Sequence, residues 1–179
     1  MTLAGIRSHV HSSNIENLVE RFGLQDVQTV TTPLTPRTIL TKDQCPTTPD
    51  EINDIAGSRY RELIGSLQYA LLATCPDITY ALNKLAQFLA NPGRDADLRV
   101  LRYLKGMKNR SLHLGGGIPD IAGFSDSDWG GDHDDRKSTG AYIFRLGLGE
   151  VSWKSRKQAS VAPSRVYGYV PGGEGGCLA

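Results

Sequence analysis

The first half of the chain places its hydrophobic residues at helical spacing. In SSNIENLVERFG the apolar side chains stand at positions i, i+3, i+4 and i+7, which predicts an amphipathic helix with one buried face. Ser13 is a suitable N-cap for this helix, and Gly23 is placed to end it. Three further helices are predicted between residues 58 and 110, where apolar residues again recur every three or four positions. Because short connections separate these three helices, we expect them to pack as a small bundle.

Residues 28–57 interrupt the helical pattern with a run rich in Thr and Pro. Proline lacks the amide hydrogen and the backbone freedom that a helix interior requires. The run contains Pro33, Pro36, Pro46 and Pro49, and it is predicted to be an extended linker. A stretch of this length without a helix or strand is unusual inside one compact domain, so we expect it to join two parts of the structure.

Beyond residue 111 hydrophobic and polar residues alternate, which is the pattern of half-buried strands. The segments SLHL, DIAGFSD, TGAYIFRL and GEVSWKS predict short strands separated by turns rich in Gly and Asp. The predicted fold class is therefore α+β, with a small helical bundle followed by an incomplete antiparallel sheet of three main strands. Residues 163–179 show no period, and five of the last twelve residues are glycine, so we expect this tail to be disordered.

Composition narrows the class of protein without indicating a function. Charged residues make up 22% and hydrophobic residues 39% of the chain, as in ordinary soluble globular proteins. The formal net charge of +1 gives no overall attraction to nucleic acid, so any such attraction must be local. The three cysteines are widely spaced and form no CxxC pair, which favours a reducing compartment. The sequence shows neither a signal peptide nor a membrane-spanning segment, and we expect an intracellular protein of the cytoplasm or nucleus, not a secreted one.

Five aspartates crowd into ten residues between the second and third predicted strands: Asp126, Asp128, Asp132, Asp134 and Asp135. Asp126 ends an apolar strand and shares a strand face with Asp128, which suits one part of a two-metal phosphodiester site. An aspartate at a strand end is equally common as a structural feature, and the pattern alone leaves the two interpretations level. The other three lie among glycines and before Arg136 and Lys137, which favours a solvated, internally neutralised turn.

An ordered series of motifs distinguishes between these interpretations. The segments ENLVERFGLQD, YRELIGSLQYALLATCPDITYALNKLAQFLANPGR, GFSDSDWGGDHDDRKSTGAYIF and VSWKSRKQASVA resemble the copia-type retrotransposon polyprotein, and the likeness runs from about Ile15 to Ala162. The resemblance implies the C-terminal end of a reverse transcriptase followed by the start of a ribonuclease H domain. It also implies that Asp126 is a ligand for Mg²⁺, with Asp128 beside it, and that Trp129 and Trp153 are core residues.

The resemblance divides the chain into five segments. These are an N-terminal helical segment ending the reverse transcriptase (1–27), the linker (28–57), a thumb- or connection-like helical region (58–110), a truncated ribonuclease H-like sheet (111–162) and the tail (163–179). The family's polymerase site carries an aromatic-x-Asp-Asp turn that does not occur here. After QASVA the family continues into a helix that carries the second catalytic carboxylate, and here PSRVYGYV follows.

The expected function follows from these departures. The parent activities are RNA-directed DNA polymerase and RNA–DNA hybrid ribonuclease, and both require a full set of metal-binding carboxylates. The chain is therefore interpreted as a truncated remnant of these enzymes that is non-catalytic on its own. Asp126 is its vestigial catalytic carboxylate, and Asp126 and Asp128 are vestigial metal ligands that are not expected to bind Mg²⁺ stably.

A domesticated nucleic-acid-binding module without catalysis is the alternative interpretation. Its candidate phosphate contacts are Arg102, Lys105, Lys108, Arg110, Lys154, Arg156 and Lys157. The same residues also fit ordinary solvated faces. The expected partner is an RNA–DNA hybrid or other nucleic acid, bound weakly, with no membrane and no small-molecule substrate. A third interpretation is a nuclease whose missing carboxylates come from another chain.

The sheet is also expected to be only marginally stable. Its usual covering helix is absent after the third strand, which leaves an apolar face and an unpaired edge exposed to solvent. Poor solubility and binding of a hydrophobic dye are the expected consequences.

We predict that residues from about Pro163 onward are encoded out of frame. The resemblance ends abruptly after QASVA, where the composition becomes rich in glycine. One permitted codon choice for SRVYGYVPGGEGGCLA, when read one base later, spells QESMAMFQAVREAVW, which has helical periodicity and a glutamate near its start. Sequencing the underlying DNA should show this helix in the shifted frame. Stop codons in that frame, or no likeness to the family, would contradict the prediction.

Overall fold

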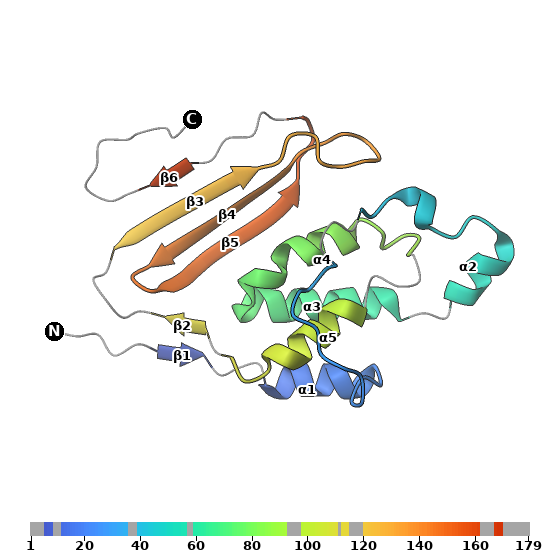
Figure 1. Ribbon diagram of the computed structural model, residues 1–179, viewed down its shortest axis with the longest axis horizontal. Coiled ribbons are helices and arrows are strands. Elements are labelled where there is room, and N and C mark those ends of the chain that lie inside the picture. Colours follow the sequence, from blue (N-terminus) through green and yellow to red (C-terminus); the bar gives the residue numbers. More distant parts are fainter. Residues whose placement is uncertain are drawn as a thin grey trace. The chain divides into compact units, whose positions relative to one another are not determined.

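The computed structural model describes residues 6–8, 12–35, 39–56, 59–92, 98–110, 112–114, 120–161 and 167–169. The chain forms two compact units. The helical unit is Val10–Arg110, and the strand unit is Met1–His9 together with Ser111–Ala179 (Figure 1). Helices precede an open antiparallel sheet along most of the chain, and the predicted α+β fold class is confirmed.

The described part of the helical unit contains α1 (Ser12–Arg21), α2 (Pro49–Ala56), α3 (Tyr60–Thr74), α4 (Thr79–Ala86) and α5 (Leu98–Met107). Two short 3₁₀ turns, η1 (Lys42–Gln44) and η2 (Pro76–Ile78), precede α2 and α4. The four helices predicted from apolar spacing correspond to α1, α3, α4 and α5. Ser13 lies inside α1 rather than before it, and Gly23, with φ 67°, follows the end of that helix as expected.

A hydrophobic core holds the helical unit together. Helices α1, α3, α4 and α5 each turn apolar side chains into it, and Leu67, Leu85 and Leu101 are fully buried. The Tyr60 hydroxyl donates a buried 2.7 Å hydrogen bond to the backbone oxygen of Leu85, which links α3 to α4. Helices this short are marginal by themselves, so burial of their apolar faces is what stabilises them. In the described part of the chain, no helix combines the length and the hydrophobicity needed to cross a membrane.

Helix α2 lies within residues 28–57, where the prolines predict an extended linker with no regular helix across most of its length. That prediction is wrong for Pro49–Ala56. The Thr48 side-chain oxygen accepts the Glu51 amide at 3.4 Å, and the Glu51 carboxylate accepts the Thr48 amide at 3.1 Å in return. This reciprocal pair is a capping box. Pro49 stands at the first helical position, where its missing amide hydrogen removes no hydrogen bond.

Within its described residues the strand unit holds two antiparallel sheets. In the smaller one, β1 (Ile6–Ser8) pairs with β2 (Leu112–Leu114). The larger has the order β5-β4-β3-β6, with β3 (Ile121–Ser127), β4 (Thr139–Leu146), β5 (Gly149–Lys157) and β6 (Tyr167–Tyr169). Its three main strands follow one another along the chain. Residues 128–138 join β3 to β4, and a tight turn at Gly147, with φ 60°, joins β4 to β5.

Both ends of the chain differ from expectation. Residues 1–27 are predicted to be one helical segment, yet Ile6–Ser8 forms a strand, and the first residues belong to the strand unit. Residues 163–179 are predicted to be disordered, yet Tyr167–Tyr169 forms β6 along the outer edge of β3. The remainder of that tail lies outside the described residues.

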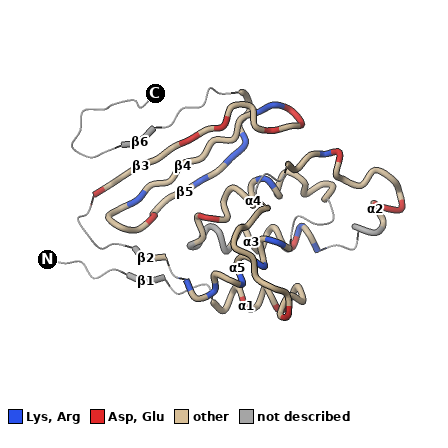
Figure 2. Tube along the Cα trace, in the orientation of Figure 1, with Lys and Arg blue, Asp and Glu red and all other residues tan. Residues whose placement is uncertain are grey.

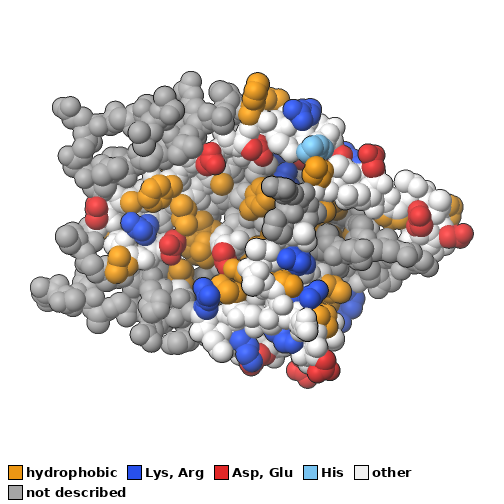
Figure 3. Space-filling view, viewed as in Figure 1, with side chains coloured by type: hydrophobic (Ala, Val, Ile, Leu, Met, Phe, Trp, Pro, Cys, Tyr) orange, Lys and Arg blue, Asp and Glu red, His pale blue; other side chains and the backbone are white. Residues whose placement is uncertain are grey.

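The main sheet leaves large apolar side chains exposed, as the sequence predicts. Four of them, on β3 and β4, are 40% to 58% exposed: Ile121, Phe124, Phe144 and Leu146. Figure 3 shows hydrophobic side chains gathered over this sheet on the face turned to the viewer. The prediction that Trp129 is a core residue is wrong, because it is 75% exposed in the loop after β3, whereas Trp153 is half-buried.

We predict that Leu67→Ala lowers the free energy of unfolding of the helical unit by about 2–5 kcal/mol, because it leaves a cavity in the core. Leu98→Ala is the matched control. Leu98 is 41% exposed at the start of α5, so a loss below about 1 kcal/mol is expected. Urea titration followed by far-ultraviolet circular dichroism measures both values, and equal losses would contradict the assignment of the core.

Candidate functional site

The candidate site is the end of β3 together with the loop that leads to β4. Figure 2 shows acidic residues following one another from β3 into this loop, and basic residues along β5. Asp126 is exposed near the end of β3, where it lies opposite Ala141 of β4. Strand alternation places it on the same face of the sheet as Phe124. The predicted metal ligand therefore stands on an open sheet face.

Asp128 ties the start of the loop to the next strand. Its Oδ1 accepts the backbone amide of Thr139 at 2.6 Å, and its own amide donates to the Thr139 oxygen at 3.1 Å. The side chain also lies against Gly131, where an added Cβ atom would collide with Oδ2. Next to it the fully buried Ser138 hydroxyl accepts the Gly130 amide at 3.1 Å. Asp128 is thus a structural link at the base of the loop.

Asp132 is the buried centre of the loop, with 6% exposure. Its Oδ1 accepts the backbone amides of Asp134 and Asp135 at 3.0 and 3.3 Å. Its Oδ2 lies 2.7 Å from the Lys157 Nζ. The prediction of a solvated turn is therefore wrong for Asp132. The turn is internally neutralised as predicted, but the main cation comes from β5 rather than from the basic residues beside it in the sequence.

Lys157 serves two carboxylates, because its Nζ also lies 2.9 Å from Asp135 Oδ1. Burial alone would raise the pKa of the Asp132 carboxyl, but hydrogen bonds from Lys157 and from backbone amides outweigh it and hold that pKa below its usual value. The hydrogen bond from Lys157 likewise holds the pKa of Asp135 well below its usual range. Burial lowers the pKa of Lys157, but its two carboxylate partners outweigh this effect and raise it. All three groups therefore stay charged at neutral pH.

The two carboxylates implied as metal ligands do not by themselves fit Mg²⁺. That ion requires a near-octahedral set of oxygens and gives up its waters reluctantly. Asp128 is engaged with the Thr139 amide, which leaves Asp126 to supply a carboxylate alone. Across the described residues, no group of three or more His, Cys, Asp or Glu side chains is arranged to hold a metal ion.

Several predicted phosphate contacts on α5 are engaged inside the helical unit. The Lys105 ammonium donates to three backbone oxygens within residues 24–27, at 2.5 to 3.3 Å. The Arg102 Nε donates to the Gln28 backbone oxygen at 2.7 Å. Lys108 forms an ion pair at 3.3 Å with a glutamate of α1. Lys105 and Arg102 fasten the segment after α1 to α5, whereas Lys108, just past the end of α5, contacts α1 itself. The sequence pattern did not predict these structural roles.

The predicted phosphate contacts of β5 lie on two faces of the sheet. Lys154 and Arg156 are exposed on one face, whereas strand alternation puts Lys157 on the other, where it contacts Asp132 and Asp135. The two-residue period of the strand already separates Lys157 from its neighbours, and this could have been inferred from the sequence. In the helical unit, Arg110 is exposed just after α5.

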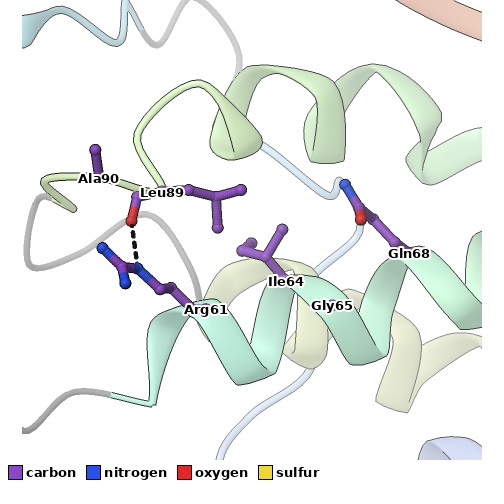
Figure 4. A pocket seen from close by; sticks show the side chains of 6 residues that line it. All are labelled: Arg61, Ile64, Gly65, Gln68, Leu89 and Ala90. Carbon is purple, nitrogen blue, oxygen red and sulfur yellow. Dashed lines mark hydrogen bonds between the residues drawn. The ribbon is translucent and has the colours of Figure 1, made fainter.

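A shallow hollow of about 410 Å³ lies in the helical unit beside α3. Figure 4 shows Arg61, Ile64 and Gln68 of α3 on one side of it and Leu89 and Ala90 on the other. The Arg61 Nε donates to the Leu89 backbone oxygen at 2.9 Å and closes one end. The six residues that line the hollow include no carboxylate, histidine or cysteine, so they offer no acid–base pair and no set of metal ligands.

The chain matches curated proteins over most of its length. It is 40% identical, across 84% of its residues, to the retrovirus-related Pol polyprotein from transposon TNT 1-94 of Nicotiana tabacum and, across 84% again, to that from transposon RE1 of Arabidopsis thaliana. It spans only 12% and 10% of the length of these two relatives. It is also 33% identical to an uncharacterized mitochondrial protein of Arabidopsis thaliana, across 89% of this chain and 68% of that protein. No family model matches the chain, and no solved structure gives a significant match.

We predict that Lys157→Met lowers the free energy of unfolding of the strand unit by about 2 kcal/mol at neutral pH. The substitution leaves the buried Asp132 carboxylate without its cation, and the loss is below that of a fully buried pair because the Lys157 side chain keeps 22% exposure. Lys154→Met, on the exposed face of the same strand, is the matched control and should cost under about 0.5 kcal/mol. Both tryptophans lie in the strand unit, so tryptophan fluorescence during urea titration measures its stability.

Lys157→Met should also change how the stability of the protein falls at acidic pH. Because the folded-state pKa values of Asp132 and Asp135 lie below the unfolded ones, their contribution is present above about pH 4 and is lost as the pH falls through the folded values. Melting temperatures of the wild type should therefore fall below about pH 4, and those of Lys157→Met should fall less steeply there. Parallel acid limbs in the two proteins would show that Lys157 does not set these pKa values.

Proposed function

The chain belongs to the Pol polyproteins of copia-type retrotransposons, and we propose that this segment is a non-catalytic piece of their reverse transcriptase and ribonuclease H region. Both parent activities act on phosphodiester bonds through metal ions that several converging carboxylates hold in place. The proposal therefore depends on which carboxylates of this chain are available to a metal ion.

The main support for the proposal is that the carboxylates near Asp126 are already hydrogen-bonded or ion-paired within the protein. Asp128 accepts the Thr139 amide, and Asp132 accepts two backbone amides and the Lys157 ammonium. To join a metal ion beside Asp126, either side chain would have to give up charge-assisted hydrogen bonds that hold the loop. Asp132 would also have to leave its buried position. These carboxylates therefore stabilise the loop in place of catalysis.

The polymerase half of the proposal rests on the sequence of the chain. Its single pair of adjacent aspartates is Asp134–Asp135, in the loop between β3 and β4. Asp135 lies 2.9 Å from the Lys157 Nζ and 3.3 Å from the Lys137 Nζ, so its carboxylate is already neutralised by two ammonium groups. An aspartate pair placed in this way does not form a polymerase metal site.

We predict that the purified protein cleaves the RNA strand of an RNA–DNA hybrid no faster than a buffer blank, with either Mg²⁺ or Mn²⁺ present. Asp126→Asn is the matched variant. It should give the same background rate and the same melting temperature, because Asp126 is exposed. Metal-dependent cleavage by the wild type that this variant abolishes would overturn the proposal.

A second experiment tests whether another chain can supply the carboxylates that a ribonuclease H site at Asp126 would need. Here the protein is mixed with an intact Pol polyprotein whose own ribonuclease H carboxylates have been replaced. We expect no cleavage in this mixture. Cleavage that requires Asp126 of the present chain would show that the segment is a working half-site and not a remnant.

A further inference from the structure

Arg99 of α5 is a half-buried cation with an unsatisfied hydrogen-bond donor. Its Nη2 donates a 3.0 Å hydrogen bond to the side-chain oxygen of Thr32. Its Nε is buried and has no hydrogen-bond acceptor. Within the described residues Arg99 forms no ion pair with a carboxylate, whereas Arg59 is paired with Glu62. Because buried donors without acceptors are uncommon in folded proteins, this side of the guanidinium is suited to an anionic ligand.

The two nitrogens lie on the same edge of the planar guanidinium. Nε and Nη2 direct their hydrogens to one side, and together they form a fork that matches two oxygens of a phosphate. The Thr32 side-chain oxygen accepts only from Nη2. A phosphoryl group on that oxygen would add three strong acceptors one bond further out. One of these acceptors can therefore reach the Nε that Thr32 itself leaves unsatisfied.

The segment that carries Thr32 is fastened to α5 along its length. Figure 1 shows this segment crossing α5 after α1. Arg99, Arg102 and Lys105 recur every three residues on one side of α5, and each donates to the segment. Val30, two residues before Thr32, packs against the hydrophobic core. These contacts hold the Thr32 side chain beside the guanidinium fork.

The sequence around Thr32 fits a protein kinase. Thr32 is followed by Pro33, and a threonine before a proline is the acceptor of proline-directed kinases. Proline keeps the preceding residue extended, which is the conformation in which a kinase holds its substrate. Residues 28–35 form neither helix nor strand, and Thr32 is half-buried. The hydroxyl can therefore be presented to a kinase without the unfolding of a helix or a strand.

We propose that Thr32 is a phosphorylation site and that Arg99 holds the phosphothreonine. A proline-directed kinase transfers the γ-phosphoryl group of ATP to the Thr32 hydroxyl oxygen, ADP leaves, and the hydroxyl proton passes to solvent. The phosphate oxygens then accept both Nε and Nη2 of Arg99. The new ion pair fastens residues 24–34 more firmly to α5, so the modification acts on the stability of the helical unit.

A second threonine followed by proline has the opposite electrostatic environment. Thr48 precedes α2, and its side-chain oxygen accepts the Glu51 amide at 3.4 Å. A phosphate on Thr48 would lie near the carboxylates of Asp50 and Glu51, which repel it. Thr48 is exposed, so it is an internal reference for a phosphothreonine without an arginine partner.

The test is treatment of the folded full chain with a proline-directed kinase and ATP, followed by mass spectrometry of its peptides and by phosphorus NMR. We expect phosphate on Thr32, with a signal that Thr32→Ala removes. The second pKa of this phosphate should fall from about 6 to about 5 or lower, because the Arg99 guanidinium stabilises the dianion. The phosphate on Thr48 should keep a second pKa of about 6 or higher.

Arg99→Gln is the matched variant, because it removes the guanidinium charge and the fork. In this variant the second pKa of phosphorylated Thr32 should return to about 6. Arg102→Gln is the control on the same side of α5, and it should keep the lowered pKa because Arg102 donates to the Gln28 backbone oxygen instead. In a urea titration followed by far-ultraviolet circular dichroism, phosphorylation should raise the midpoint of the wild type but not that of Arg99→Gln.

Three results would overturn the proposal. The first is no phosphate on Thr32 after Thr48 has been phosphorylated by the same kinase. The second is an equal pKa for the two phosphothreonines of the wild type, a comparison that remains decisive if Arg99→Gln fails to fold. The third is a lowered pKa of phosphorylated Thr32 that persists in a folded Arg99→Gln variant, since the phosphate would then be held by another group.

Discussion

The ammonium group of Lys157 is the contact on which the strand unit depends. The three main strands are paired through their backbones, and Lys157 adds a side-chain contact from the last residue of β5 to the loop between β3 and β4. Without it the buried Asp132 carboxylate would lose the ammonium group that lies 2.7 Å from its Oδ2, which is costly for a charge removed from water. The backbone of the loop also turns back on Asp132. The Arg136 amide donates to the Asp132 backbone oxygen at 2.9 Å, and Arg136 has a φ of 59°, which is unusual for a residue other than glycine.

The charges of the acidic loop between β3 and β4 are balanced by groups of the protein itself. In a metal site, a divalent cation neutralises the carboxylates. Here the same task is shared between Lys157, Lys137 and the backbone amides of the loop itself. Neutralisation from within has a structural cost, because Asp132 and Asp135 are held by Lys157 and by backbone amides of the loop and are not available to a metal ion beside Asp126. On the face of β3, β4 and β5 opposite to Asp126, the charged residues are Lys154 and Arg156, which are exposed, because a register shift at Phe144/Arg145 pairs Glu150 with Arg145.

Sequence periodicity predicted α1, α3, α4 and α5 because the core they share imposes the same spacing on each helix. It missed α2 because proline was treated as a helix breaker, although the T-x-x-E motif at Thr48 and the proline that follows mark a helix start. The position of Asp126 on a strand was likewise predictable. The contact between Lys157 and Asp132 was not, because residues far apart in sequence leave no local pattern when a loop folds back. The pairing of β1 with β2 was missed for the same reason.

That last pairing gives the molecule an order of assembly. Ile6 lies opposite Leu114, so the whole helical unit is inserted into the chain between two partner strands. During synthesis β1 leaves the ribosome first, and β2 does not exist until every helix has been made. The entropy of closing so long a loop rises only with the logarithm of its length, but contacts between distant residues form slowly. The helices of the helical unit are neighbours in sequence, so this unit folds while β1 is still unpaired. The pairing of β1 with β2 is therefore among the last steps of folding.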